Sequence, residues 1–226
     1  MNNLDKPKFI TFEGGEGSGK STQSKMLFEF LLSKRIKAIH TREVGGTIEA
    51  EKIRNILLHS ELYATSELML VMAARYEHIN KVIIPALLDG NWVICDRYID
   101  SSACYQSGDL GLTIDDIFDL HHKLMKISYN NEIDNINNQN FLLTHQGLMP
   151  DLTFFMDVPP SIGLERVSIR GDMNKFEEKN FTFHQNIYDK FKIIAENNLD
   201  RIITIECENN NIDQIHQIII KKIFNY

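Results

Sequence analysis

Cysteine is scarce in this chain of 226 residues. Cys95, Cys104 and Cys207 are odd in number and show neither CxxC spacing nor a Cys/His ligand pattern. This excludes a disulfide framework and a zinc-type metal site. We expect three reduced, mostly buried thiols, as in a protein of a reducing compartment.

Basic charge and long apolar runs are lacking as well. Lysine and arginine number 24 against 31 acidic residues, for a net charge of −7. A general nucleic-acid-binding surface needs clustered cations, so it is not expected, although a local basic pocket for a small anion remains open. No stretch reaches the roughly 18 apolar residues of a membrane span, and Met1 to Phe12 has no signal-peptide core. The prediction is a cytoplasmic protein that binds neither membrane nor nucleic acid.

Short apolar runs alternate with longer amphipathic stretches over a single domain, residues 1–226, in which we find no repeat and no linker. This alternation is typical of βαβ units and predicts an α/β fold with a five-stranded parallel sheet flanked by helices. The expected strands are Lys8–Glu13, Ala38–Thr41, Trp92–Asp96, Leu152–Asp157 and Ile202–Glu206. The expected helices are Lys20–Ser33, Glu49–Leu58, Ser66–Leu88, Thr113–Lys126, Phe183–Glu196 and Ile212–Phe224.

Asparagine is concentrated between Tyr129 and Asn140. Asparagine competes with helix formation and offers no apolar surface to bury. We therefore expect a solvated insertion over about residues 127–146.

A phosphate-binding pattern follows the first predicted strand directly, since the sequence fits GxxxxGK followed by serine. Consecutive backbone N–H groups of such a loop can surround phosphates, and the next helix points its positive end at them. The lysine, Lys20, can reach the β- and γ-phosphates, and the Ser21 hydroxyl can ligate Mg²⁺. The predicted ATP-binding residues are Gly14, Gly15, Glu16, Gly17, Ser18, Gly19, Lys20, Ser21 and Thr22.

An acidic and a basic residue end the third predicted strand. Val93, Ile94 and Cys95 lead into Asp96, at the sheet edge where ligands bind in doubly wound folds. Asp96 can hold Mg²⁺ together with Ser21, and Arg97 can meet an anionic substrate. The chain is therefore predicted to be an Mg²⁺- and ATP-dependent enzyme of the P-loop NTPase fold, with three layers.

The stretch from Ile94 to Gln106 resembles the signature of thymidylate kinases, Asp-Arg-(Tyr/Phe/His)-x-x-Ser-x-x-Ala-Tyr-Gln. Three further motifs occur in the same order along the chain as in the family. Thr41 to Thr47 resembles the TREPGGT loop, Ala73 to Arg75 resembles the AAR helix, and Pro150 to Val158 resembles the PDLTxxLDV strand. The resemblance implies a kinase that phosphorylates dTMP to dTDP with ATP in dTTP biosynthesis. It also implies a homodimer.

The resemblance assigns an acceptor site residue by residue. Arg97 matches the arginine that holds the acceptor monophosphate, Arg75 the one that bonds thymine, and Tyr105 the tyrosine near the sugar. Val71 stands where the family usually places a phenylalanine stacked on thymine. The full set of substrate-binding residues expected here is Glu13, Arg42, Val71, Arg75, Arg97, Ser101, Ser102, Tyr105 and Gln106.

A lid over about residues 166–180 is also implied, with Arg166, Arg170 and Lys175 as cations for the transition state. Glu16 stands where another class of these kinases has a P-loop arginine, so this is the bacterial pattern, in which the lid supplies these charges. Together with Lys20 and Arg97, the three lid cations are the predicted catalytic residues. Lys175 and Val44 depart from the family, which tends to have arginine and proline there.

Three alternatives remain open on the sequence. Another nucleoside-monophosphate kinase shares the P-loop and lid. A deoxynucleoside kinase needs a base near a sugar hydroxyl, for which Glu13 is a candidate. A GTP-dependent switch needs an NKxD element, and Asn174 to Glu177 ends in Glu instead.

Overall fold

The computed structural model describes residues 8–108, 111–125, 147–171 and 173–224. The insertion predicted at about 127–146 lies outside these residues. Over them, five parallel strands form one sheet in the order β2-β3-β1-β4-β5. The strands are β1 (Phe9–Glu13), β2 (Ala38–Arg42), β3 (Trp92–Asp96), β4 (Leu152–Asp157) and β5 (Ile202–Glu206). The predicted α/β fold with a parallel sheet is confirmed, and strand ends differ by one residue at most.

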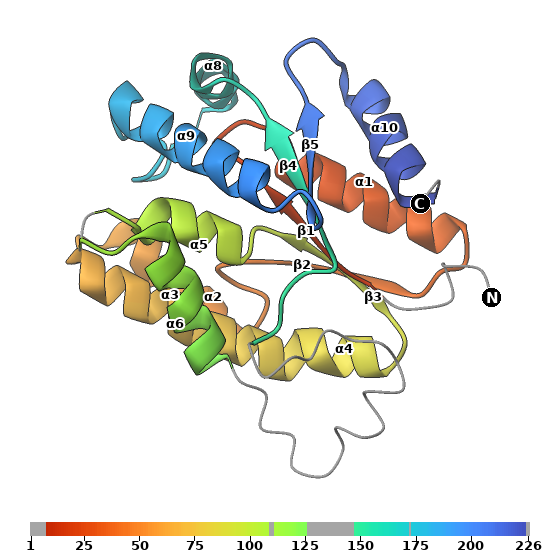
Figure 1. Cartoon of the computed structure of the whole chain (residues 1–226), viewed down its shortest axis with the longest axis horizontal. Helices are drawn as coiled ribbons and strands as arrows, with labels where there is room; N and C mark the ends of the chain where they lie inside the picture. Colours follow the sequence, from red (N-terminus) through yellow and green to blue (C-terminus); the bar gives the residue numbers. More distant parts are fainter. Residues whose placement is uncertain (1–7, 109–110, 126–146, 172, 225–226) are drawn as a thin grey trace.

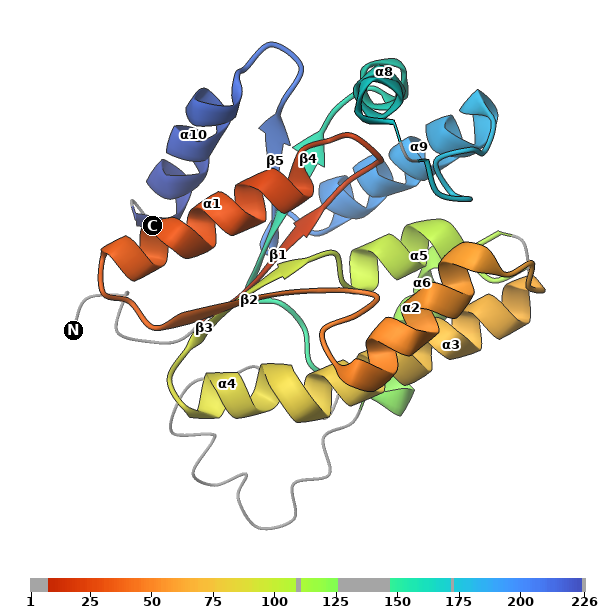
Figure 2. The same ribbon diagram turned by 180° about the vertical axis from the view of Figure 1, so that it is seen from behind.

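Helices cover both faces of the sheet (Figures 1 and 2). They are α1 (Lys20–Ser33), α2 (Ile48–His59), α3 (Ala64–His78), the π-helical turn η1 (Ile79–Ile83), α4 (Ile84–Leu88), α5 (Ile99–Gln106), α6 (Ile114–Leu124), α8 (Pro160–Arg170), α9 (Phe181–Asn197) and α10 (Ile212–Phe224). None of the helices in the described part of the chain is long and apolar enough to span a bilayer.

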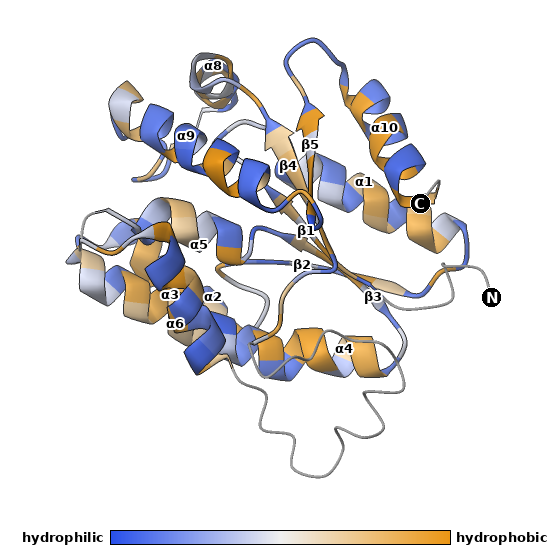
Figure 3. Cartoon of the chain, in the orientation of Figure 1, coloured by the Kyte–Doolittle hydropathy of each residue, from blue (hydrophilic) through white to orange (hydrophobic). Residues whose placement is uncertain are grey.

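Two buried clusters lie on opposite faces of the sheet, because successive strand residues point to opposite sides. On β1, Ile10 and Phe12 pack with α1 and α10, whereas Phe9 packs with α3 to α6 and α9. The inner strands are accordingly largely hydrophobic in Figure 3, whereas β2 at the edge of the sheet is polar over residues 40–42, and α9 and α10 alternate between polar and apolar faces. A parallel sheet covered on both faces requires this composition.

The long helix predicted over Ser66–Leu88 is interrupted. Regular α-helix stops at His78, a π-helical turn spans Ile79–Ile83, and Pro85 opens the next helical segment. Proline lacks the N–H that would bond back one turn and its ring crowds the preceding carbonyl, so a widened turn accommodates it. The prediction of one uninterrupted helix was wrong at this point.

Two helices were not predicted. Six of the eight residues of α5 are buried, so the helix has no polar stripe and no amphipathic period. The other, α8, begins at a Pro-Pro pair and contains Gly163. Both carry or adjoin residues of the site described next.

Candidate nucleotide site

The loop after β1 is held in shape by its glycines. Gly14, Gly17 and Gly19 have φ values of 141°, 67° and 91°, in the region that favours glycine. A Cβ on Gly17 would lie 2.1 Å from the carbonyl oxygen of Gly163 on α8, so the loop lies directly against that helix. Gly19 caps α1 without a side-chain bond, and no acidic residue lies in the first turn of α1. The positive end of α1 is thus available for an anion.

The ammonium of Lys20 lies inside this loop. Its Nζ donates to the carbonyl oxygen of Gly15 at 2.5 Å and to the Ser18 hydroxyl at 3.2 Å. Burial, assisted by the nearby charge of Arg97, lowers the pKa of Lys20 to about 8, although Glu16, Asp96 and Glu13 oppose this. A bound phosphate would supply the negative charge that this buried cation lacks.

Ser21, in the first turn of α1, meets Asp96 at the end of β3. Asp96 pairs in register with Phe12 at the end of β1, and the Ser21 hydroxyl donates to Asp96 Oδ2. Asp96 Oδ1 is buried and has no hydrogen-bond partner among the described residues. A hydroxyl and a carboxylate with a spare oxygen are ligands that Mg²⁺ accepts, so these residues fit the ion predicted here. Thr22 lies exposed in the same first turn of α1.

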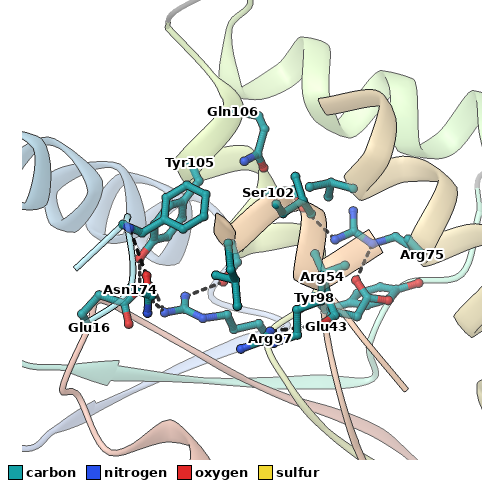
Figure 4. A pocket seen from close by; sticks show the side chains of 16 residues that line it. Glu16, Glu43, Arg54, Arg75, Arg97, Tyr98, Ser102, Tyr105, Gln106 and Asn174 are labelled. Carbon is teal, nitrogen blue, oxygen red and sulfur yellow. Dashed lines mark hydrogen bonds and ion pairs between the residues drawn. The ribbon is translucent and has the colours of Figure 1, made fainter. Parts of the chain in front are cut away.

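Arg97 occupies the middle of the site (Figure 4). Its backbone has φ 69°, and its guanidinium donates to Gly14 O at 3.1 Å, Ser101 Oγ at 3.0 Å and Glu16 Oε1 at 2.8 Å. The guanidinium also lies over the Tyr105 ring, 5.2 Å from its centroid. These contacts fix the fork, a geometry suited to two phosphate oxygens.

Two buried carboxylates flank Arg97 and carry opposite pKa shifts. Burial alone would raise the pKa of Glu16, but Arg97 and Lys20 lower it to about 2. Burial and the charge of Asp100 raise the pKa of Glu13 to about 7, although Ser101 donates to it at 2.5 Å and Tyr98 N at 2.7 Å. Glu16 is therefore a fixed anion, whereas Glu13 titrates near neutral pH.

A second arginine, Arg75, lies at the other end of the pocket and is 1% exposed. Its Nε donates to Glu43 at 2.7 Å and its Nη2 to Ser102 at 2.7 Å, while its buried Nη1 has no partner within the described residues. Burial lowers the pKa of Arg75, but Glu43 more than offsets this, so the pKa stays above its usual value. Glu43 also bonds His78 at 3.0 Å. The unpartnered N–H group is a donor held ready for an acceptor atom of a ligand.

Both ends open into one pocket of about 140 Å³. It is lined by Glu16, Glu43, Val44, Arg54, Leu57, Leu58, Val71, Arg75, Arg97, Tyr98, Ser101, Ser102, Tyr105, Gln106, Asn174 and Phe176. Most of the predicted substrate-binding residues are in this set, and Glu13 reaches it through Ser101. Arg42 is the exception, since its half-exposed guanidinium bonds Glu51 at 2.8 Å.

The three predicted lid cations have different surroundings. Arg166 lies against the P-loop, with Nη1 3.4 Å from Gly17 O, and Arg170 bonds Glu177 at 2.5 Å. Lys175 instead donates to Ser60 O at 3.0 Å and pairs with Glu67 at 2.5 Å, on the far side of the pocket.

Sequence reasoning assigned no site role to eight lining residues: Glu43, Val44, Arg54, Leu57, Leu58, Tyr98, Asn174 and Phe176. Glu43 lies inside the matched Thr41 to Thr47 loop, and its acidic character next to an arginine-rich pocket was an available indication. Arg54, which bonds Val44 O at 3.0 Å, had no such indication.

Comparisons with known proteins agree with this geometry. A sequence model of the family described as Thymidylate kinase matches residues 12–128 and 126–219. The chain is 48% identical over 221 residues to the thymidylate kinase of Rickettsia bellii strain RML369-C, covering 98% of both. It is 47% identical to that of Rickettsia canadensis strain McKiel, covering 98% of this chain and 99% of that one. A crystal structure of thymidylate kinase from Ehrlichia chaffeensis matches with a TM-score of 0.64 and 31% identity, covering 96% of this chain and 99% of that one.

Proposed function

The chain belongs to the thymidylate kinase family, and from this premise we propose that it transfers the γ-phosphoryl group of ATP to dTMP, forming dTDP for dTTP biosynthesis. One observation supports this most directly. A single pocket beside the P-loop has the fork of Arg97 at one end and the unpartnered Nη1 of Arg75 at the other. A nucleoside monophosphate presents a phosphate and a base at two ends in the same way.

The acceptor is bound through both ends. Arg97 grips the monophosphate bidentately, while Arg75 and Ser102 hold the base, with Arg75 donating to a carbonyl oxygen of the pyrimidine. Val71 and Gln106 border the base, and Tyr105 borders the sugar together with Ser101 and Glu13. Arg42 comes from the neighbouring loop and reaches the phosphate only if its bond to Glu51 opens.

The donor is held by the P-loop. Backbone N–H groups of residues 14–19 and the start of α1 bind the phosphates of ATP, and Lys20 contacts the transferred group. Ser21 and Asp96 would hold Mg²⁺, which would offset the negative charge of the phosphates when it is bound.

The chemical step needs no side-chain base. An anionic oxygen of the dTMP phosphate attacks the γ-phosphorus, and the bond to the bridging oxygen of ADP breaks. Charge spreads over the equatorial oxygens, where Lys20 and Arg97 would stabilise it, together with Arg166 and Arg170 of the lid once Arg170 leaves Glu177. Lys175, the third predicted lid cation, would have to leave Glu67 and Ser60 to join them. A lid over residues 166–180 excludes water from the transfer.

Incubating the protein with ATP, Mg²⁺ and each of dTMP, dUMP, dCMP, AMP, GMP and thymidine tests the proposal. We expect ADP release to be fastest with dTMP and to form dTDP. Cytosine has an amino group, a donor, where thymine has the 4-carbonyl oxygen that would accept from Arg75. The kcat/KM for dCMP should therefore be at least tenfold lower than that for dTMP. Faster turnover of thymidine than of dTMP would instead identify a deoxynucleoside kinase.

We also propose a homodimer and a cytoplasmic location. Exposed apolar side chains lie along the adjacent helices α2 and α3, namely Ile48, Ile56, Met69 and Tyr76, as a dimer interface requires. All three cysteines are buried and unpaired, in keeping with a reducing compartment.

The dimer is tested by sedimentation equilibrium, which should give twice the chain mass of 26.1 kDa, and Met69→Glu should shift the species toward 26.1 kDa. A wild-type chain that stays monomeric at micromolar concentration would contradict the dimer.

A further inference from the structure

Residues 174–177, here named the lid turn, form a pre-built loop between α8 and α9. The Asn174 side-chain oxygen accepts from the backbone N–H of Phe176 at 2.9 Å and of Glu177 at 3.3 Å. The Glu177 carboxylate in return accepts from Asn174 N at 3.0 Å, and Glu177 is 3% exposed. These bonds fix the backbone of the lid turn, so the side chains of Lys175 and Phe176 leave it in set directions.

Lys175 leaves the lid turn toward the opposite wall of the pocket. It donates to Ser60 O, just after α2, and to Glu67 in the first turn of α3. The side chains of this pair are only 24% and 18% exposed, so solvent screens the attraction less than at an open surface. The lid turn is therefore fastened to the α2–α3 side of the pocket.

Phe176, the next residue, lines the pocket itself. Its ring meets Tyr105 edge-on at 6.0 Å between centroids, and Lys175 Nζ lies 5.1 Å from the centre of the Phe176 ring. Two α3 side chains belong to this lining, Val71 and Arg75, and neither offers a ring. Two other aromatic side chains of the lining are already engaged: Tyr105 with Arg97 and Glu16, and Tyr98 with Leu148 O and the Arg75 guanidinium. Phe176 is the lining phenylalanine in the described part of the chain.

We propose that Phe176 contacts the acceptor nucleoside and supplies the aromatic surface that Val71 does not, and that Lys175 is a positioning residue holding Phe176 in the pocket. The proposal rests on the proposed function, because it takes the pocket to be the dTMP site. It gives Lys175 a role different from the transition-state cation expected from the sequence. Loss of an aromatic contact with a base weakens binding roughly five- to hundredfold.

Titrating dTMP into the protein without ATP, by calorimetry, tests both parts. Phe176→Ala should raise Kd at least tenfold, and Phe176→Leu, which keeps apolar bulk, should raise it less. Lys175→Met and Glu67→Gln should each raise Kd about three- to tenfold. Because the two residues act as one pair, the Kd of the double variant should not exceed the higher of the two single-variant values. The control is Lys179→Met, which removes an exposed lysine two residues beyond the lid turn.

The kinetic pattern separates positioning from catalysis. A positioning role puts the effect of Lys175→Met mainly into Kd and KM for dTMP, with ADP affinity unchanged. A fall in kcat with unchanged dTMP affinity would overturn that role, and wild-type affinity in Phe176→Ala would overturn the contact. Failure of the wild-type chain to bind dTMP contradicts the proposed function instead. In that case the same variants are titrated with the monophosphate that the chain does phosphorylate, so that the contact of Phe176 is tested independently of the proposed substrate.

Discussion

Lys20→Ala is expected to lower kcat by about 10³-fold or more, equivalent to about 4 kcal/mol, while the protein remains folded. Lys20 is the one P-loop side chain with a full positive charge, and it lies where the transferred phosphoryl group would pass. Arg97 cannot take its place, because bonds to Gly14, Ser101 and Glu16 hold the guanidinium at its own position in the pocket. Single-turnover kinetics at saturating ATP and dTMP measure the loss, and activity within tenfold of wild type would remove the P-loop lysine from the mechanism.

Two further variants separate this effect from damage to the fold. Lys25→Ala changes an exposed lysine of the same helix, paired only loosely with Glu29 at 3.9 Å, and should leave kcat unchanged. Lys20→Met keeps the apolar stem, should be as inactive as Lys20→Ala, and should raise Tm at pH 7.

The gain in Tm follows from the lowered pKa of Lys20. Because its folded pKa of about 8 lies below 10.5, the unfolded chain holds this proton more tightly. The ammonium therefore destabilises the fold fully below pH 8, and this penalty disappears as the pH rises toward 10.5. The Tm difference between Lys20→Met and wild type should narrow over that range, as thermal melts at pH 7, 9 and 10 would reveal.

Arg97→Lys is expected to lower kcat/KM for dTMP by about 10²-fold, or about 2.7 kcal/mol, even though the positive charge is kept. The guanidinium bonds three groups and lies on the Tyr105 ring, and this arrangement holds the plane of the fork in the pocket. A lysine ammonium can neutralise Glu16 but cannot meet two phosphate oxygens in one plane. Both KM for dTMP and kcat should be affected.

Arg35→Lys provides a matched control for the backbone. Arg35 has φ 60° and is, with Arg97, one of two non-glycine residues at positive φ in the described ranges. It is exposed after α1 and does not line the pocket, so its substitution should leave kcat/KM unchanged. Unchanged kinetics in Arg97→Lys as well would refute the clamp on the acceptor phosphate.

Local patterns explain what the sequence predicted well. The strands β1, β3 and β4 are short runs of mostly buried residues, and the P-loop is a contiguous motif whose chemistry depends on neighbours in the chain. Asp96 and Ser21, which were predicted to share Mg²⁺, lie within hydrogen-bond distance because the carboxyl ends of adjacent parallel strands meet at one edge. The helices were harder to predict, since α5 has no polar face and Pro85 widens the turn before it.

Long-range contacts explain what could not be predicted. The partners of Lys175 are 108 and 115 positions away, and no local pattern states that a lid lysine will bond Glu67 and Ser60. Phe176 was overlooked for the same reason, because only the lid turn brings it into the pocket. The bond of Arg42 to Glu51 competes with its expected role, and it forms through the geometry of the helix that follows. Residues whose surroundings are set by distant segments need the fold before they can be assigned.

The contact between Gly17 and Gly163 constrains how this protein can evolve. A Cβ on Gly17 would strike the backbone of Gly163, and a Cβ on Gly163 would lie 2.2 Å from the backbone oxygen of Glu16. A pair of interacting side chains such as Arg75 and Glu43 can be replaced during evolution when both residues are substituted together. Here each obstacle is main chain, so no second substitution at the facing position relieves the first. Gly17 of the P-loop and Gly163 of α8, the helix that carries Arg166 and Arg170, are therefore two positions at which a larger residue is excluded and cannot be compensated by a second substitution.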